Sequence, residues 1–233
     1  MPTNATYPVH TPPETKMVYP DLPIADRRND DLVRLTLPEP PATLDLESLF
    51  GNDHPVEIEI GTGKGRFLLL AATARPDVNF IGVEYAARYL SRAVDRIAKR
   101  ALSNVRLVHA EAADLLETYL PEGSLSGCHI YFPDPWPKKR HHKRRIIRPD
   151  VLALLARSLH RGALLRIATD HAHYAAAISE TLALAPDFEQ ARNSKEYWEL
   201  PGMGDYTRAG VTNFEIKYRR EGREIHRFVW IRR

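Results

Sequence analysis

The sequence predicts an α/β domain in which a doubly wound parallel sheet is closed by a C-terminal antiparallel hairpin. Three observations predict it. From Val56 onward, short apolar runs alternate with helical stretches, a glycine-rich loop joins one such run to a helix, and the chain ends in two successive strand-like runs. Alternation of this kind is typical of a parallel sheet with helices on both faces.

The predicted parallel strands are short and mostly β-branched or aromatic, as buried strands of such sheets are. Helical stretches separate them, so neighbouring strands can run in the same direction. These strands are Val56–Ile60, Asn79–Glu84, Val105–Ala110, Gly127–Phe132 and Ala163–Thr169.

The clearest predicted helix runs from Ala86 to Leu102, with an apolar face and a basic face at helical spacing. Further helices should follow Pro149-Asp150 and Asp170. At the C-terminus, Thr212–Arg219 and Glu224–Ile231 read as two strands joined around Glu221-Gly222, which leaves no room for a helix between them.

Residues 1–45 are predicted to form a proline-rich, extended and poorly ordered arm before a domain that spans 46–233. Nine of the eighteen prolines lie in residues 1–41, with little apolar periodicity around them. Residues 1–50 carry a net charge of −4, so the remainder carries +7. No apolar run is long enough to span a membrane, and the first residues do not resemble a signal peptide. A single cysteine, Cys128, is consistent with a reducing cytoplasm.

The strongest local motif is the glycine loop Glu57-Ile58-Glu59-Ile60-Gly61-Thr62-Gly63-Lys64-Gly65, between a predicted strand and a predicted helix. Its spacing differs from a dinucleotide fingerprint, because Arg66 stands where the third glycine would be, and from a P-loop, because no Gly-Lys-Ser/Thr follows. Glu59 would repel a pyrophosphate but suits the ammonium group of a methionine moiety. The E-x-G-x-G-x-G pattern resembles the first motif of S-adenosylmethionine methyltransferases.

Two more acids end the next two predicted strands, at the sheet edge where ligands bind in such folds. Glu84 can accept hydrogen bonds from both ribose hydroxyls, and Glu111 is placed to meet the adenine amino group. Asp114, one turn into the next helix, is the alternative for the adenine contact. Taken singly, each acid could equally be a surface carboxylate or a helix cap.

The fourth predicted strand leads into Tyr131-Phe132-Pro133-Asp134-Pro135-Trp136-Pro137. The prolines stiffen the backbone around Asp134, so its carboxylate is presented rigidly at the same edge. The alternative is an ordinary proline-rich turn. Trp136 could stack on a displaced base or simply pack against the core.

Seven basic residues and no acid occur between Lys138 and Arg148, directly after this loop. A basic block is often only a solvated face, but its place beside the predicted reaction edge favours binding of phosphates. His141 and His142 lack partners at metal-ligand spacing, so we expect no metal.

With these motifs in order, residues 50–233 resemble the bacterial tRNA (guanine-N7-)-methyltransferases, a family of Rossmann-like class I S-adenosylmethionine methyltransferases that modify the variable-loop guanosine. The resemblance is most specific from Phe132 to Arg145. The motifs that carry it are Glu59-Ile60-Gly61, Gly82-Val83-Glu84, Phe132-Pro133-Asp134-Pro135-Trp136 with the basic block, Thr169-Asp170 and Thr212-Asn213-Phe214-Glu215.

The resemblance implies S-adenosylmethionine as the cofactor and tRNA as the partner, with phosphate contacts through residues 138–148. Glu111 is a departure, because the family more often has Asp or Asn there. Neither a membrane nor an obligate protein partner is implied. By the resemblance, the glycine loop (Gly61, Gly63 and Gly65), Glu59, Glu84, Glu111 and Asp134 lie on the cofactor side, and Lys138, Asp170, Thr212, Asn213, Phe214 and Glu215 contact the substrate.

The chemistry of N7 methylation suits a fixed carboxylate. Guanine N7 has a lone pair, so attack on the methyl group needs no general base, whereas the product ring is cationic and Asp134 can stabilise that growing charge. Two other functions stay open. An amino-methyltransferase acting on adenine N6 or guanine N2 carries a similar Asp/Asn-Pro-Pro-aromatic loop, and a catalytically silent RNA-binding protein could keep the same fold.

Overall fold

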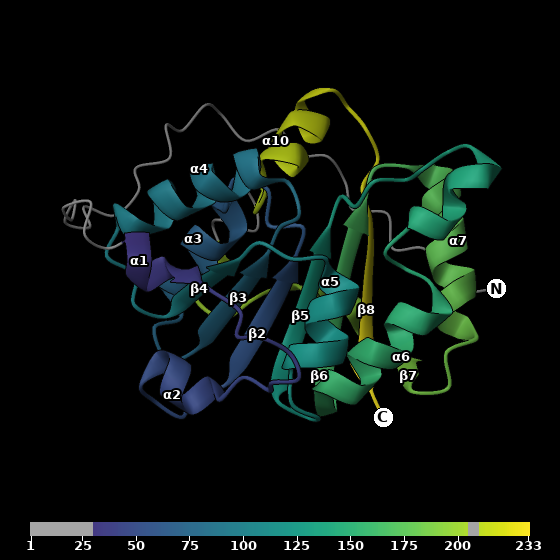
Figure 1. Cartoon of the computed structure of the whole chain (residues 1–233). Coiled ribbons are helices and arrows are strands. Elements are labelled where there is room, and N and C mark those ends of the chain that lie inside the picture. Colours follow the sequence, from purple (N-terminus) through teal and green to yellow (C-terminus); the bar gives the residue numbers. More distant parts are fainter. Residues whose placement is uncertain (1–29, 205–209) are drawn as a thin grey trace.

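The central sheet has eight strands in the order β1-β4-β3-β2-β5-β6-β8-β7 (Figure 1). The computed structural model describes residues 30–204 and 210–233. The first six strands of that order pair in parallel, whereas β8 pairs antiparallel with both β6 and β7. The strands are β1 Arg34–Leu35, β2 Val56–Ile60, β3 Asn79–Val83, β4 Val105–Val108, β5 Leu125–Tyr131, β6 Leu159–Thr169, β7 Phe188–Gln190 and β8 His226–Arg232.

The five predicted parallel strands are confirmed as β2 to β6, and the parallel sheet with antiparallel closure is confirmed as well. Strand order reverses between β2 and β5, which pair with each other although β3 and β4 come between them in the chain. In sheets of this kind, the crevice beyond the carboxyl ends of the strands at such a switch point is where ligands bind. The loops after β2 and β5 are the glycine loop and the Asp134 loop.

Helices cover both faces of the sheet (Figure 1). One core lies under α6 and α7, and the other lies under α3 and α4. The described helices are α1 Asp30–Val33, α2 Leu46–Phe50, α3 Arg66–Ala74, α4 Ala87–Ala98, α5 Ala112–Asp114, α6 Pro149–Ser158, α7 Ala172–Ala183, α8 Ser194–Trp198 and α10 Asn213–Arg220, with a π-helical turn η2 Leu115–Tyr119 and a 3-10 helix η3 Lys139–Arg144. None of the helices in these ranges is long and apolar enough to cross a membrane.

The predicted strand Thr212–Arg219 is wrong, because residues 213–220 form helix α10. Its N-terminus is capped on both sides: Thr212 Oγ1 accepts a hydrogen bond from Glu215 N–H at 3.0 Å, and Glu215 Oε2 accepts one from Val211 N–H at 2.9 Å. A Thr followed three residues later by Glu is a helix-start pattern that outweighs alternation of apolar residues. The antiparallel partners of β8 are therefore β6 and β7, not a hairpin strand.

The predicted division between arm and domain at residue 45 stays a prediction. Residues 1–29 lie outside the described residues. Residues 30–45, however, join the domain: β1 pairs with β4 at the sheet edge, and Val33 and Leu44 are buried. The part of the predicted arm that the structure describes therefore packs against the sheet.

Candidate active site at the switch point of the sheet

The glycine loop turns tightly out of β2 and into α3. The N–H groups of Gly61 and Thr62 both donate to Val83 O, at 2.9 and 3.2 Å, which ties the loop to the end of β3. Gly61, Gly63 and Gly65 all have positive φ, at 78°, 58° and 69°. Such angles are strained for other residues, and a Cβ at Gly65 would also lie 2.9 Å from Ala93 Cβ in α4. The loop therefore needs glycine at these positions.

Glu59 lies under this loop and is only 3% exposed. Among the described residues, its Oε2 has no hydrogen-bond partner. Burial raises the pKa of Glu59 well above its ordinary value and the charge of Glu84 adds to this, whereas a hydrogen bond with Thr62 acts in the opposite direction. A buried carboxyl of this kind either holds a proton or requires a cation beside it.

Glu84 joins the glycine loop to α4. Its Oε2 accepts a hydrogen bond from Gly63 N–H, and its Oε1 accepts one from Ala86 N–H, both at 2.8 Å. Each carboxylate oxygen has a second lone pair, so both hydroxyls of a ribose could still donate to it. The predicted ribose contact is compatible with this geometry and stays a prediction.

Glu111 and Asp114 are both exposed, and Glu111 occupies the N-cap position of α5 without a capping hydrogen bond from its side chain. The adenine contact therefore stays a prediction for either residue.

Sequence reasoning missed Tyr85 and His109, which lie near Glu84. Tyr85 follows Glu84 and is exposed, and its ring stacks on His109 with 6.2 Å between ring centroids. The signal available in the sequence was an aromatic residue directly after an acid at a strand end.

The Asp134 loop is held in an unusual backbone conformation. Phe132 and Trp136, on either side of Asp134, have φ of 53° and 42°, which non-glycine residues rarely adopt. Strained residues of this kind cluster at functional sites. Phe132 N–H donates to Ala168 O at 2.7 Å, and Arg145 Nε donates to Pro135 O at 2.9 Å. These bonds fix the loop from both sides, while Asp134 itself is exposed and makes no ion pair within the described ranges.

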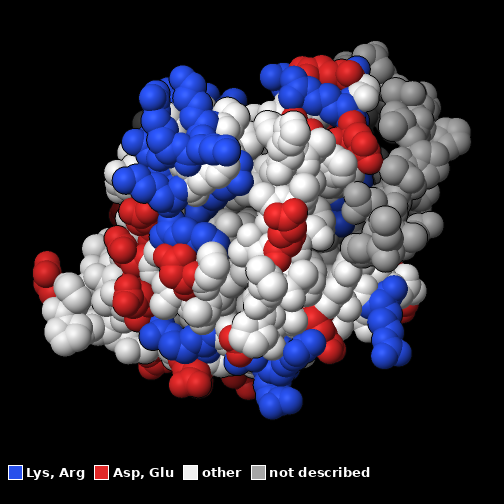
Figure 2. All heavy atoms as spheres, turned by 90° about the vertical axis from the view of Figure 1, so that its right-hand side faces the viewer, with Lys and Arg blue, Asp and Glu red and all other residues white. Residues whose placement is uncertain are grey.

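The basic block forms η3 and packs against the Asp134 loop. Trp136 is the contact: the Arg144 guanidinium carbon lies 5.0 Å from its ring centroid, and the His141 ring meets it edge-on at 5.8 Å. Trp136 therefore packs on the basic segment. Lys138, Lys139 and Lys143 are exposed and form no ion pair among the described residues, so their charges face solvent. Figure 2 shows Lys and Arg side chains gathered on the upper rim of one face, as a large group and a smaller one.

The predicted substrate residues at the C-terminus separate into two sets. Thr212 and Glu215 are buried and hold α10, since Glu215 forms ion pairs with Arg219 and Arg227 in addition to its capping bond. Asn213 and Phe214 are exposed on the same helix. The geometry thus gives Glu215 a positioning role.

Asp170 directly follows β6, and its Oδ2 pairs with Arg223 Nη1 at 2.8 Å. The charge of Asp170 also acts on the Tyr218 hydroxyl. Burial raises the pKa of Tyr218, and the charges of Asp170, Glu221 and Asp134 raise it further, whereas that of Arg223 lowers it. The end of β6, the Asp134 loop and α10 therefore meet at one place on the sheet edge.

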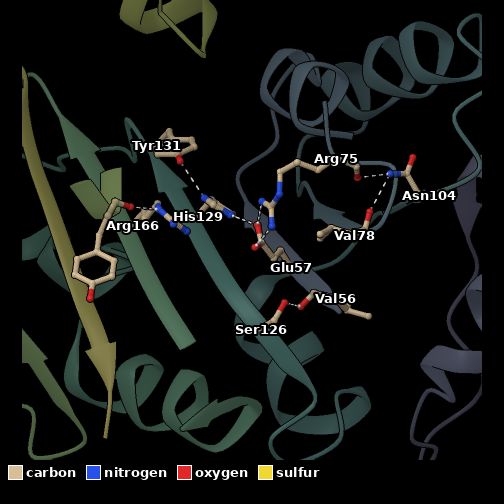
Figure 3. A network of polar contacts seen from close by, with 10 residues as sticks. Val56, Glu57, Arg75, Val78, Asn104, Ser126, His129, Tyr131 and Arg166 are labelled. Carbon is tan, nitrogen blue, oxygen red and sulfur yellow. Dashed lines mark hydrogen bonds and ion pairs between the residues drawn. The ribbon is translucent and has the colours of Figure 1, made fainter. Parts of the chain in front are cut away.

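A buried polar network joins β2, β5 and the end of α3 beneath the site (Figure 3). Glu57 accepts two hydrogen bonds from Arg75, at 2.8 and 2.9 Å, and a third from His129 Nε2 at 2.8 Å. His129 Nδ1 lies 2.9 Å from the Tyr131 hydroxyl. Burial lowers the pKa of His129, against the effect of Glu57, so the ring is neutral: it donates to Glu57 and accepts from Tyr131. The network fixes the strand that leads into the Asp134 loop. Sequence reasoning did not find it.

Comparisons with known proteins agree with this arrangement. A family model described as "Putative methyltransferase" matches residues 53–228. A tRNA (guanine-N(7)-)-methyltransferase of Nocardia farcinica is 40% identical over 198 residues, which cover 80% of this chain and 71% of that protein. One from Streptomyces avermitilis is 42% identical over 165 residues, 71% of this chain and 57% of that protein.

Solved structures show the same fold at low sequence identity. A SAM dependent methyltransferase from Aquifex aeolicus has a TM-score of 0.53 at 13% identity, covering 81% of this chain and 88% of that one. The antibiotic-resistance methyltransferase Kmr has a TM-score of 0.52 at 20% identity, covering 81% of this chain and 91% of that one.

Proposed function

Because this chain belongs to the tRNA (guanine-N7-)-methyltransferase family, we propose that it transfers a methyl group from S-adenosylmethionine to N7 of the variable-loop guanine in tRNA. The observation that carries the proposal is the placement of a buried carboxyl, whose Oε2 has no hydrogen-bond partner among the described residues, under a glycine loop and on the strand next to the one that leads to a rigid exposed carboxylate. Glu59 lies at the end of β2 and Asp134 follows β5, and β2 and β5 are paired neighbours.

The residues at the end of β2 fit the cofactor. When bound, S-adenosylmethionine supplies a methyl group on a positively charged sulfur. Glu59 Oε2, which has no partner among the described residues, can accept hydrogen bonds from its ammonium group, and the resulting ion pair offsets the burial of the carboxylate. The glycines at 61 and 63 leave the loop backbone open to close approach, whereas Gly65 lets the loop pack against α4. Glu84 is placed for the ribose.

Asp134 acts on the other side of the reaction. Its carboxylate is exposed at the sheet edge and is held by a strained loop, so it needs no reorganisation to face a guanine ring that becomes positively charged. It can also accept a hydrogen bond from a nucleobase N–H. Because N7 itself carries the attacking lone pair, alignment and electrostatics are all that the chain has to supply.

The basic segment, residues 138–148, supports tRNA as the substrate. Its exposed lysines begin four residues after Asp134, and Trp136 anchors the segment to the Asp134 loop. Phosphates bound there would therefore lie beside the reacting base. The positive charge of this segment complements the phosphate backbone, which carries the negative charge of RNA.

The test is transfer of labelled methyl groups from S-adenosylmethionine to an unmodified tRNA transcript, followed by chain cleavage at N7-methylguanosine. A second transcript has the variable-loop guanosine replaced by adenosine. We expect label and cleavage in the first transcript and neither in the second. Label without cleavage would identify an amino-methyltransferase, and tight tRNA binding without label would identify a silent RNA-binding protein. Cleavage at another guanosine would correct only the position.

A further inference from the structure

An exposed cluster of aromatic side chains lies beside the carboxylates of Asp134 and Asp170. Phe214 on α10 is 50% exposed, an unusual degree for so large an apolar side chain. It stacks on Tyr218, with ring centroids 5.7 Å apart and planes inclined by 24°. Phe132, next to Pro133-Asp134, lies 6.4 Å from Phe214 and 5.5 Å from Tyr218. We call Phe132, Phe214 and Tyr218 the aromatic cluster.

Tyr218 is already engaged by cations. The Arg223 guanidinium carbon lies 4.5 Å from its ring centroid, and the Lys217 ammonium lies 5.6 Å away. Phe214 and Phe132 have no such cation contact among the described residues, so Phe214 is the open end of the stack. Phe132, which has a positive φ in the Asp134 loop, lies next to it.

The charge around the aromatic cluster favours a cation. Arg223 is paired with Asp170 at 2.8 Å and with Glu221 at 2.8 Å, and Lys217 lies 3.7 Å from Glu221. Asp134 adds a carboxylate with no ion pair in the described ranges. The Asp134 carboxylate also acts on Tyr218, so it lies beside the aromatic cluster. An incoming positive ring would meet this carboxylate and an electron-rich aromatic face.

We propose that the aromatic cluster, with Phe214 as its contact face, stacks on the target guanine and binds the positively charged N7-methylated ring more tightly than the neutral one. The proposal rests on the proposed function and extends it to recognition of the product charge. Aromatic faces attract cations through their quadrupole, and bases stack on such rings whatever their sequence. A preference that grows as the methyl group arrives lowers the barrier as well as holding the product.

The experiment uses two small probes, N7-methylguanosine 5′-monophosphate and guanosine 5′-monophosphate, and measures their dissociation constants by equilibrium dialysis. The parent chain should bind the methylated probe at least about threefold more tightly, the low end of a cation–π contact. Phe214→Leu keeps an apolar side chain but removes the aromatic ring, so the ratio should fall to near one. Phe214→Tyr keeps the ring and should keep the ratio. Leu184→Ala, an exposed apolar residue just beyond the far end of α7, is the matched control and should leave it unchanged.

Two results would overturn the inference: equal affinities of the parent for both probes, or a ratio in Phe214→Leu that equals the parent's. Its failure is distinguishable from failure of the proposed function, because the tRNA assay has no part in the dialysis. Methylation of the tRNA guanine with no preference between probes would sink the inference alone. A preference lost in Phe214→Leu would support the inference even if the tRNA transcript accepted no label.

Discussion

Two glutamates on one face of β2 should respond in opposite ways to the same substitution. Glu57 and Glu59 are two residues apart, so both point to the side of the sheet that α3 and α4 cover, and both are buried. Glu57 accepts hydrogen bonds from Arg75 and His129, whereas Glu59 Oε2 has no partner among the described residues. Changing each to Gln keeps the shape and removes the charge, so the pair isolates what the charge does.

Glu59→Gln should stabilise the chain in the absence of cofactor. Burial raises the pKa of Glu59 well above its ordinary value of 4.5. The folded state therefore binds a proton that the unfolded state releases, and the free energy of unfolding falls by about 1.4 kcal/mol for each pH unit from 4.5 up to the raised pKa. Because Gln does not ionise, the Glu59→Gln variant should not lose this free energy of unfolding as the pH rises. The same change should weaken S-adenosylmethionine binding at least about thirtyfold, because the ammonium group would lose its buried counter-charge.

Glu57→Gln should instead destabilise the chain. Burial alone would raise the pKa of Glu57, but the hydrogen bonds from His129 and Arg75 outweigh it and hold the pKa well below its ordinary value. Its contribution is therefore present above about pH 4.5 and is lost as the pH falls through the folded pKa. Removing one partner leaves the Arg75 guanidinium, whose side chain is only 13% exposed, without its counter-charge. Breaking a buried pair in this way costs about 3–5 kcal/mol.

Urea unfolding at pH 5, 6 and 7 measures the stabilities, and calorimetric titration with S-adenosylmethionine measures the affinities. The expected result at pH 7 is a higher urea midpoint for Glu59→Gln and a lower one for Glu57→Gln, with unchanged slopes. Glu117→Gln, an exposed acid with no ion pair in the described part of the chain, is the control. If Glu59→Gln lowered the midpoint and left the affinity unchanged, Glu59 would be a structural residue and the reasoning would be refuted.

Three further changes test the rest of the site. Asp134→Asn should reduce kcat for methyl transfer far more than tRNA affinity, by about a hundredfold or more if the carboxylate stabilises the developing charge; equal losses in kinetics and filter binding would make it a turn residue. Lys138→Ala should lower the dependence of log affinity on log salt by about one unit, and an unchanged slope would remove it from the phosphate contacts. Gly65→Ala should destabilise the fold by more than Gly123→Ala, because both have positive φ but only the Gly65 site places a Cβ against Ala93; equal urea midpoints would contradict the close approach of α3 and α4.

The parallel part of the fold was predictable because its signals are local. Each of β2 to β6 is a short apolar run bounded by a turn, and the helix after Pro149 begins at the proline that predicted it. The glycine loop and the Asp134 loop were found for the same reason, since each combines a strand end with residues that restrict the backbone. A loop of this kind can therefore be located from the sequence alone, while the roles of its residues stay predictions.

The errors occurred where two local signals compete or where the partner is distant. The run from Thr212 to Arg219 alternates enough to resemble a strand, but the Thr212–Glu215 cap selects a helix. The predicted substrate contacts of the same two residues stay a prediction, and in the structure Glu215 forms ion pairs with Arg219 and Arg227. The prolines in residues 38–41 concealed the fact that β1, before them, pairs with β4, more than seventy residues away.

Strand β2 shows why a sequence pattern alone could not predict which acids belong to the site. In Glu57-Ile58-Glu59-Ile60 the two acids are equivalent by any periodicity, and both lie buried on one face. What separates them is supplied from elsewhere: Arg75 and His129, 18 and 72 residues away, donate hydrogen bonds to Glu57, and Arg75 also supplies a counter-charge. No described residue does the same for Glu59. Glu57 is thus part of the polar network of the fold, whereas Glu59 keeps an oxygen without a hydrogen-bond partner among the described residues, which is why we propose it for the ammonium group of the cofactor.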